Sequence, residues 1–411
     1  MKILFLSQRF LLPMDTGGKI RTGKILEQLS QQHDITVVGN FEEAKDALHR
    51  TRMASLCRRF VPVVWREPER ESLNFYFRVL KHSLSRFPVT ALNDYSAALE
   101  RSLLDTLAEE RFDLAICDFV QSALLFRQVK GLPRLLFQHN VETRIAERHM
   151  RNAGNALTRF FWRRQYRRMQ RFEMQAVRDF DAVIAVSEGD AEVFRTDFGG
   201  RNVDAIPTGV DLDFYQASPE SAGAGCKELV FCGSMDWLPN EDAIRFFLEE
   251  IAPALDQQIP GWNLTVVGRN PSEWLKRTAS ENGRVTLTGW VDDVRPYLDA
   301  AAVSIVPLRI GGGTRMKIYE SMAMSKAVVS TAIGAEGLAV SDGENIHLAD
   351  TPVDFASAIV RLIEKEAHRK EMESAARALV EAHFGWARVA DVFSELCEQT
   401  VLNYRESARS H

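Results

Sequence analysis

The sequence predicts an α/β protein with two doubly wound, parallel-sheet domains, and three observations lead to this fold class. Strand-like and helical runs alternate through the first half of the 411-residue chain, as they do in parallel sheets that helices cover on both faces. A second such series, with several strands that end in glycine, starts near Lys227. Between the two series lies a segment of small residues, Gly and Pro, which is typical of an exposed domain boundary.

The first series contains strand-like apolar runs with helical patterns between them. These runs are Lys2–Ser7, Asp34–Val38, Leu114–Cys117, Leu135–Gln138, Ala182–Val186 and Val203–Ile206. Because crossovers between parallel strands are right-handed in nearly all known proteins, these strands form one doubly wound sheet. We therefore predict a first domain over residues 1–207. Although the N-terminal apolar run looks like the start of a signal peptide, Gln8 and Arg9 interrupt it, and a buried first strand explains it better.

The second series predicts another sheet over residues 208–385. Its strands are expected at Leu229–Ser234, Leu264–Gly268, Val285–Gly289, Val303–Leu308 and Lys326–Thr331. Several glycines follow directly at the carboxyl ends of these strands, where open α/β sheets bind their ligands. The remaining residues, 386–411, contain an amphipathic helix from Trp386 to about Tyr404.

The most informative stretch is Gly311-Gly312-Gly313-Thr314-Arg315-Met316-Lys317, which follows a strand-like run and opens a helix. Glycines let the backbone turn its N–H groups toward an anion, and the positive end of the helix favours the same anion. Arg315 and Lys317 add full charges, and Glu320 could accept two hydrogen bonds from a ribose diol. This pattern predicts a nucleoside-diphosphate site that is not a Walker loop. A glycine-rich turn with solvated charges is the alternative.

The order of these motifs resembles the C-terminal domain of retaining GT-B glycosyltransferases of family four, the glycogen-phosphorylase-like group 1 enzymes. The match runs from about Leu229 to Trp386 and extends more weakly through the first half. The resemblance implies two Rossmann-like domains facing across a cleft, with residues 386–411 crossing back to the first domain. It also implies transfer of a hexose from a nucleotide sugar to a hydroxyl of a glycan or lipid-linked acceptor, in bacterial exopolysaccharide or lipopolysaccharide synthesis.

The resemblance also assigns site residues. His139, Arg315 and Lys317 are the expected catalytic residues. The expected donor-binding residues are Gly17, Gly18, Gly233, Asn240, Gly289, Trp290, Val291, Gly312, Gly313, Thr314 and Glu320. Gly17 and Gly18 lie in a strand-to-helix turn whose amides could meet a phosphate or an acceptor, although an ordinary βα turn explains them too.

His139 lies in the sequence Phe137-Gln138-His139-Asn140-Val141-Glu142, directly after a predicted strand. A histidine at the carboxyl end of a strand is well placed for a site, and in the resembled family this residue contacts the transferred sugar. Glu188 and Asp118 also follow strands. For Glu188, an N-cap at Ser187 explains the pattern without a site, and we treat Asp118 with the same caution.

Two departures from the family pattern bear on donor binding. Many relatives carry two glutamates seven residues apart, but here the first position is Gly312 and only Glu320 remains. Many also carry an Arg and a Lys in the loop after the first strand of this domain, whereas residues 234–240 contain neither. Arg315 and Lys317 are therefore our candidates for the missing phosphate charges.

Composition excludes several classes of function. The formal net charge of −5 gives no general attraction to nucleic acid. The five cysteines are scattered without metal-site spacing, which favours a reducing compartment. No D-x-D motif lies at a suitable place, so we expect neither a metal nor another cofactor. No apolar run reaches the ~18 residues needed to span a bilayer, and we expect a cytoplasmic protein.

Residues 144–178 contain ten arginines with interleaved aromatic residues. Such a stretch fits equally well a peripheral contact with the anionic inner face of a membrane or a solvated helix. Two alternatives to a transferase also stand. One is an epimerase or hydrolase of nucleotide sugars on the same fold, and the other is a non-catalytic protein that binds nucleotides or carbohydrates.

Overall fold

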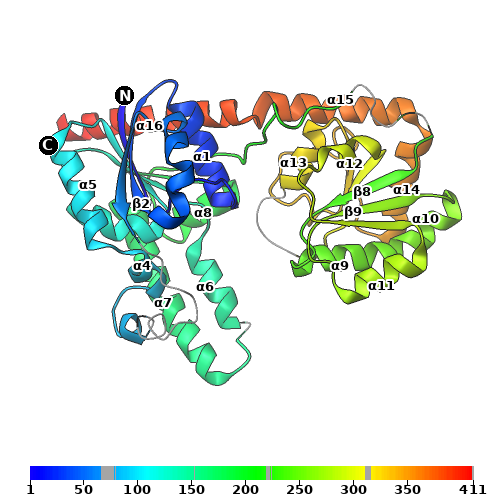
Figure 1. The fold of residues 1–411 in the computed structure, drawn as a ribbon, viewed down its shortest axis with the longest axis horizontal. Coiled ribbons are helices and arrows are strands. Elements are labelled where there is room, and N and C mark those ends of the chain that lie inside the picture. The colour runs from blue at the N-terminus through cyan, green and yellow to red at the C-terminus, as the bar shows by residue number, and fades with distance from the viewer. Residues whose placement is uncertain are drawn as a thin grey trace. The chain divides into compact units, whose positions relative to one another are not determined.

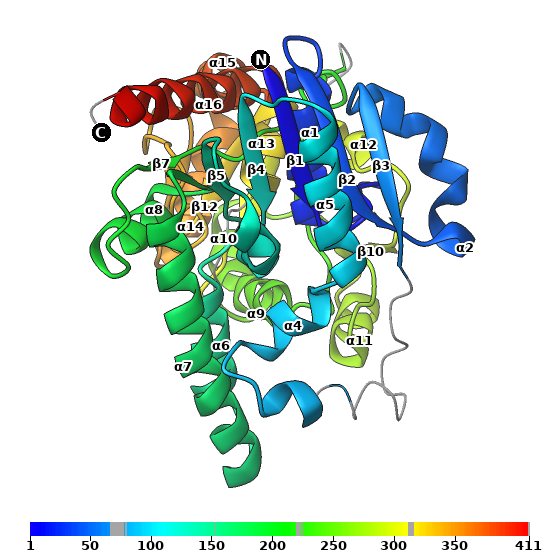
Figure 2. The ribbon, with the colours of Figure 1, turned by 90° about the vertical axis from the view of Figure 1, so that its left-hand side faces the viewer.

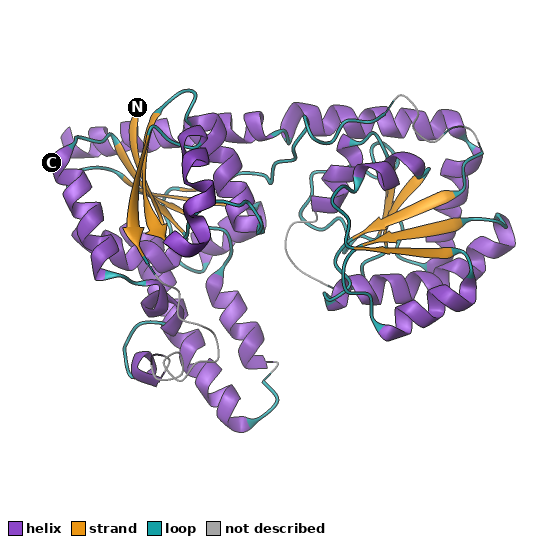
Figure 3. Ribbon diagram, in the orientation of Figure 1, coloured by secondary structure: helices purple, strands orange, loops and turns teal. Residues whose placement is uncertain are grey.

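The computed structural model describes residues 1–65, 78, 80–151, 153–218, 223, 225–310 and 316–409. The chain divides into two compact units, one formed by Met1–Pro207 with Val389–His411 and the other by Thr208–Arg388. Each unit contains a parallel sheet with helices around it, so that the predicted α/β fold class is confirmed (Figure 1; Figure 3).

The first unit contains a seven-stranded sheet in the order β3-β2-β1-β4-β5-β6-β7, and all its described strand pairs are parallel. The strands are β1 (Lys2–Ser7), β2 (Asp34–Phe41), β3 (Arg59–Val64), β4 (Leu114–Asp118), β5 (Arg134–Phe137), β6 (Ala182–Ala185) and β7 (Val203–Ala205). The central strands are buried on both faces, which explains their continuous apolar runs.

Strand β3 was not predicted, because its sequence does not read as a buried strand. It contains Pro62, which cannot donate to a ladder, and only Val63 is buried. Both features suit its place at the edge of the sheet, where proline is tolerated.

The helices of the first unit are α1 (Gly17–Leu29), α2 (Glu43–Asp46), α4 (Val89–Asp94), α5 (Ala97–Glu109), α6 (Glu142–Arg151), α7 (Ala156–Asp179) and α8 (Glu188–Thr196), with 3₁₀ helices η1 (Ala47–Ser55) and η2 (Val120–Gln128). The arginine-rich stretch thus forms two helices, α6 and α7, which pack against each other and extend away from the sheet (Figure 2). Ser187 caps α8 through the N–H of Asp190, as the sequence predicted.

Helix α16 (Trp386–Arg409) packs on the first unit from Val389 onward. The ring of Phe393 lies 5.1 Å from that of Phe137, and Ser394 Oγ lies 2.6 Å from His33 Nε2. An apolar and a polar contact therefore fix the last helix beside β5 and α1.

The second unit contains a six-stranded sheet in the order β10-β9-β8-β11-β12-β13. Its strands are β8 (Glu228–Cys232), β9 (Asn263–Val267), β10 (Val285–Gly289), β11 (Val303–Val306), β12 (Ala327–Ser330) and β13 (His347–Leu348). Its helices are α9 (Leu238–Phe246), the π-helix η3 (Phe247–Ile251), α10 (Ala252–Gln258), α11 (Glu273–Asn282), α12 (Arg295–Ala300), α13 (Met316–Ala323), α14 (Pro352–Glu364) and α15 (Glu366–His383). Strand β13, which the sequence analysis missed, has only two residues and therefore no visible period.

Candidate active site

A polar pocket of about 460 Å³ opens at the carboxyl ends of β1, β4 and β5 in the first unit. It brings together three residues that the sequence predicted, namely Gly17, Gly18 and His139. The other lining residues are Ser7, Gln8, Arg9, Leu11, Thr16, Lys19, Arg21, Asp94, Asp118, Phe119, Gln121, Asn140 and Glu142. Most of these side chains are polar, so the pocket suits a hydroxyl-rich ligand.

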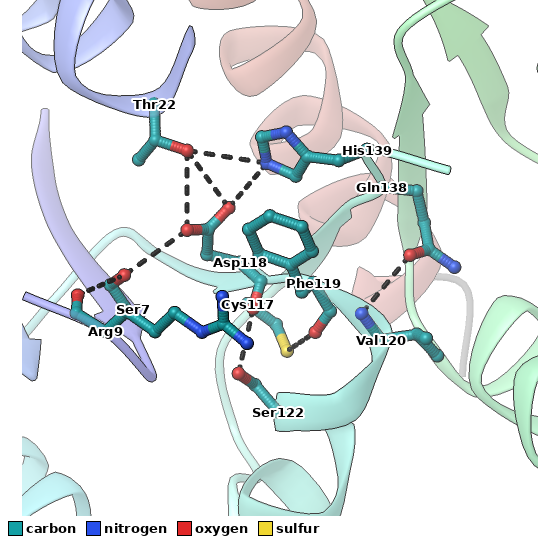
Figure 4. Close-up of polar contacts among 10 residues, drawn as sticks. All are labelled: Ser7, Arg9, Thr22, Cys117, Asp118, Phe119, Val120, Ser122, Gln138 and His139. Carbon is teal, nitrogen blue, oxygen red and sulfur yellow. Dashed lines mark hydrogen bonds and ion pairs between the residues drawn. The ribbon is translucent and has the colours of Figure 1, made fainter. Parts of the chain in front are cut away.

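His139 pairs with Asp118 inside this pocket. Its Nε2 lies 2.8 Å from Asp118 Oδ1, and both side chains are buried (Figure 4). Ser7 Oγ lies 3.3 Å from Asp118 Oδ2, and Thr22 Oγ1 lies 3.3 Å from Asp118 Oδ1. Hydroxyls from β1 and α1 thus hold the carboxylate that contacts the histidine. Asp118, which the sequence left as a doubtful candidate, thus directs its carboxylate toward His139.

The pair fixes the tautomer of the imidazole. A carboxylate can only accept, so the proton lies on His139 Nε2 and the lone pair on Nδ1. Within the described part of the chain, the buried Nδ1 atom has no hydrogen-bond partner. Burial lowers the pKa of His139, although Asp118 opposes this shift, so the ring is neutral at pH 7. The site therefore contains a neutral imidazole whose acceptor atom, Nδ1, is buried and has no partner among the described residues.

Phe119 fixes the plane of the imidazole. Its ring stacks on His139, with 3.9 Å between centroids, and its backbone has a φ of 62°, in a region that residues other than glycine rarely adopt. A Cβ atom at Gly18 would lie 2.7 Å from Cζ of Phe119, whereas one at Gly17 would meet nothing within 4 Å. A side chain at position 18 would therefore displace the Phe119 ring that stacks on the histidine.

Glu173 of α7 holds the loop that carries His139. This fully buried carboxylate accepts from the N–H groups of Glu142 and Thr143, at 2.9 and 2.8 Å, and from Thr143 Oγ1 at 2.6 Å. Gln138 Nε2 donates to it at 3.2 Å. Burial raises the pKa of Glu173 to about 7, against the effect of these donors. The sequence analysis missed this residue, whose only signal is an acid among buried positions of α7.

A second cluster of predicted residues forms where β8 and α13 meet in the second unit. Lys317 Nζ lies 2.8 Å from Asn240 Oδ1 and 4.1 Å from the ring centroid of Phe231. Asn240 Nδ2 in turn donates to the carbonyl of Ser234 at 2.8 Å. A Cβ atom at Gly233 would lie 2.7 Å from both Asn240 Nδ2 and Lys317 Nζ, so a side chain there would displace both of these groups.

Glu320 lies one helical turn after Lys317 and completes this cluster. Burial raises its pKa, while a hydrogen bond from Tyr215 and the charge of Lys317 lower it. The sequence analysis missed Tyr215 because it lies in the connection between the two series of strands. The structure thus groups Gly233, Asn240, Lys317 and Glu320, with Tyr215 added.

The remaining predicted donor residues divide into two groups. Gly289 ends β10, an edge strand, and Trp290 and Val291 follow it. Val291 packs with Tyr215 against a shared apolar cluster, whereas Trp290 is 69% exposed. Gly312, Gly313 and Thr314 lie outside the described residues, as does Arg315, which was predicted as a catalytic residue.

Arg269 supplies a positive charge that the sequence analysis did not find beside the loop after β8. It follows β9, and its Nε lies 3.0 Å from Ser234 Oγ and 3.6 Å from Asp236 Oδ2. The sequence did contain a signal for Arg269. Gly268-Arg269-Asn270 comes directly after a strand, at the edge of the sheet where ligands bind.

Metal and membrane sites were also considered for the residues that the structure describes. Among them, no group of three or more His, Cys, Asp or Glu side chains could hold a metal ion. No helix among them combines the length and the apolar character needed to cross a membrane.

Comparison with known proteins gives consistent matches. A family model described as Glycosyltransferase Family 4 matches residues 17–214, and one described as Glycosyl transferases group 1 matches residues 226–365. An uncharacterized 44.6 kDa protein in the cps region of Klebsiella pneumoniae is 21% identical, over 96% of this chain and 99% of its own length.

The D-inositol 3-phosphate glycosyltransferase of Nocardiopsis dassonvillei is 28% identical over 54% of this chain, and the match spans 56% of that enzyme. Among solved structures, Anabaena Alr3699/HepE in complex with UDP and glucose aligns with a TM-score of 0.61 and 17% identity. That alignment covers 96% of this chain and 98% of the other. At this identity the structural likeness shows a shared fold.

Proposed function

This chain belongs to the group 1 glycosyltransferases and has the GT-B fold, and we propose that it transfers a hexose from a nucleoside-diphosphate sugar with retention of configuration. The proposed acceptor is a hydroxyl of a glycan or lipid-linked saccharide, in the synthesis of a bacterial surface polysaccharide. The relative in a cps region supports this context. We place the enzyme in the cytoplasm, at the inner face of the membrane when its acceptor is lipid-linked.

The observation that carries the proposal is the Lys317–Asn240–Glu320 cluster. In the proposal, Glu320 accepts hydrogen bonds from the ribose hydroxyls of the donor. Lys317, which Asn240 orients, faces the diphosphate together with Arg315 and stabilises the negative charge that grows as the sugar–phosphate bond breaks. These cations serve in place of a metal ion, so the proposed reaction needs neither a metal nor another cofactor.

His139 serves the sugar side of the reaction. Its free Nδ1 accepts a hydrogen bond from a hydroxyl of the bound sugar or acceptor, and Asp118 keeps the proton on Nε2. In the proposed step, the bond from the anomeric carbon to the phosphate oxygen breaks and a bond to the acceptor oxygen forms on the same face. The proton of the acceptor hydroxyl passes to the leaving phosphate.

An assay of nucleotide-sugar turnover tests this function. Purified protein is incubated with UDP-, GDP-, ADP- and TDP-hexoses, with and without an extract of lipid-linked saccharides, and released nucleoside diphosphate is measured. We expect one donor class to be consumed much faster when the extract is present. Equal release without any acceptor indicates a hydrolase or epimerase, and binding without turnover indicates a non-catalytic protein. Either result contradicts the proposal.

A further inference from the structure

A second pocket in the first unit, of about 350 Å³, shares no lining residue with the first. It lies along α7 and is closed by η2 and by residues 86–87. Its lining includes five arginines and four phenylalanines, namely Arg86, Arg127, Arg134, Arg168, Arg171, Phe87, Phe126, Phe172 and Phe180. Asp179 is its single acidic lining residue, so the walls carry a large excess of positive charge.

Arg168 has an unsatisfied guanidinium in the wall of this pocket. The residue is only 9% exposed, and its Nη2 donates to the carbonyl of Ser83 at 2.9 Å. Its Nη1 is buried and has no hydrogen-bond partner among the described residues. Burial, together with the charge of Arg164, lowers the pKa of Arg168. A buried N–H donor without a partner destabilises the folded protein, and an anion in the pocket would supply the missing acceptor.

Three further arginines around the pocket also lack acidic partners. Arg86 and Arg127 lie over the ring of Phe87, at 4.9 and 5.0 Å from its centroid, and Arg171 is exposed on α7. None of the three forms an ion pair within the described part of the chain. Arg134 differs, because it contacts the carbonyl of Asp179 and lies 3.7 Å from Asp181. Four guanidinium groups are therefore available to a ligand.

The spacing of residues along α7 explains how several of its side chains line the same pocket. Residues 171, 172, 175 and 179 lie three, four, seven and eleven positions after residue 168 along α7, so all five share one face of the helix. This face contributes Arg168, Arg171 and Phe172 to the pocket wall, whereas Glu173 points to the loop of His139. One helix thus serves two separate sites.

We propose that this pocket binds a phosphoryl group carried on an apolar or aromatic moiety. Guanidinium groups match phosphate oxygens with paired hydrogen bonds, and the phenylalanine rings provide apolar walls for the remainder of the ligand. The pocket volume falls in the range of small-molecule sites. A lipid headgroup and a free phosphate ester share this chemistry, and the experiment separates them.

The test compares the full-length protein with three variants. In the first, Arg127→Gln and Arg171→Gln are combined, because both residues are exposed and line the pocket. The matched control combines Arg163→Gln with Arg167→Gln, which removes the same charge from exposed positions of α7 outside the pocket. The third, Lys317→Ala, reports on phosphate binding at the proposed donor cluster. Phenyl phosphate binding is measured by calorimetry, and vesicle binding by co-sedimentation with phosphatidylglycerol in phosphatidylcholine.

We expect at least tenfold weaker binding in the Arg127/Arg171 variant and unchanged binding in the Arg163/Arg167 control. If only phenyl phosphate binding falls, the ligand is a free phosphate ester. If vesicle binding falls as well, the pocket receives a lipid headgroup. Equal loss in both arginine pairs, no loss in either, or loss of phenyl phosphate binding in Lys317→Ala alone would overturn the proposal.

Discussion

At the scale of single residues, the Asp118–His139 pair decides which imidazole nitrogen can meet a substrate hydroxyl. In Asp118→Asn the amide can donate or accept, so the tautomer of His139 is no longer fixed. We expect kcat/KM to fall at least tenfold, because a mispositioned proton-transfer or hydrogen-bonding group commonly costs that much or more. Nucleotide affinity should not change, since this pair belongs to the first unit and the proposed donor cluster to the second.

The pH dependence of kcat/KM distinguishes this role of Asp118 from a purely structural one. His139 must be neutral to accept a hydrogen bond, and its pKa lies below the usual 6.5, so activity should be lost only as pH falls below 6.5. Asp118 favours the protonated ring, and its removal should therefore move the acid limb of the kcat/KM profile to lower pH. An acid limb that stays in place, or moves to higher pH, would contradict this account.

Some of the residues at the candidate site could be predicted from the sequence. Gly233, Asn240, Lys317 and Glu320 were predicted, and the structure groups them, because each lies at a strand end or on the helix that follows. Asp118 was set aside because its partner His139 is 21 residues away in the chain. No local pattern reveals such a contact between neighbouring strands.

At the scale of elements, α7 positions the loop that carries His139, because Glu173 accepts hydrogen bonds from the first residues of α6. A pKa raised from 4.5 to about 7 stabilises the folded state fully below pH 4.5, and this stabilisation is lost as pH rises toward 7. At about 1.36 kcal/mol per pKa unit, the loss amounts to about 3 kcal/mol.

Urea unfolding of wild type and Glu173→Gln, from pH 4.5 to 8, measures this effect. The free energy of unfolding of wild type minus that of the variant should fall by up to about 3 kcal/mol between pH 4.5 and 7. Groups common to both proteins cancel in this difference. If this difference in unfolding free energy is constant or grows with pH, Glu173 is ionised throughout the range. The hydrogen bonds to its carboxylate then outweigh the effect of burial on its pKa.

Elements with strong apolar runs were predicted well, and the failures have physical causes. Strand β3 carries a proline at a sheet edge, and β13 has two residues, so neither shows the pattern of a buried strand. The basic stretch reads as a single charged helical segment. In the structure it is two helices, and Arg168 is buried in a pocket wall, because segments distant in sequence cover one face of α7.

At the scale of the whole molecule, the proposed chemistry depends on protein cations instead of a bound metal. Lys317 and Arg315 carry the charge that would balance the leaving diphosphate, and no carboxylate cluster suited to Mg²⁺ or Mn²⁺ accompanies them in the sequence. We expect turnover of the preferred nucleotide sugar to continue at an unchanged rate in excess EDTA. A rate that falls to background and returns with Mn²⁺ would show that a metal takes part.

The overall architecture followed from the sequence because alternation of strands and helices leaves few arrangements other than parallel sheets. The identities of the sugar, the base and the acceptor did not follow, since side chains that read them come from loops with no shared pattern. The residues after β10 illustrate this, where Val291 packs inward while Trp290 is exposed.

In the proposed enzyme, the Glu320 cluster binds the nucleotide and His139 serves the sugar. Calorimetric titration of the nucleoside diphosphate that the enzyme releases tests this assignment most directly, using wild type, Glu320→Gln and His139→Ala. Charge-assisted hydrogen bonds contribute about 1.5–3 kcal/mol, so Glu320→Gln should bind roughly 10- to 100-fold more weakly. His139→Ala should bind like wild type while losing transfer. Unchanged affinity in Glu320→Gln, or equal weakening in both variants, would contradict the claim.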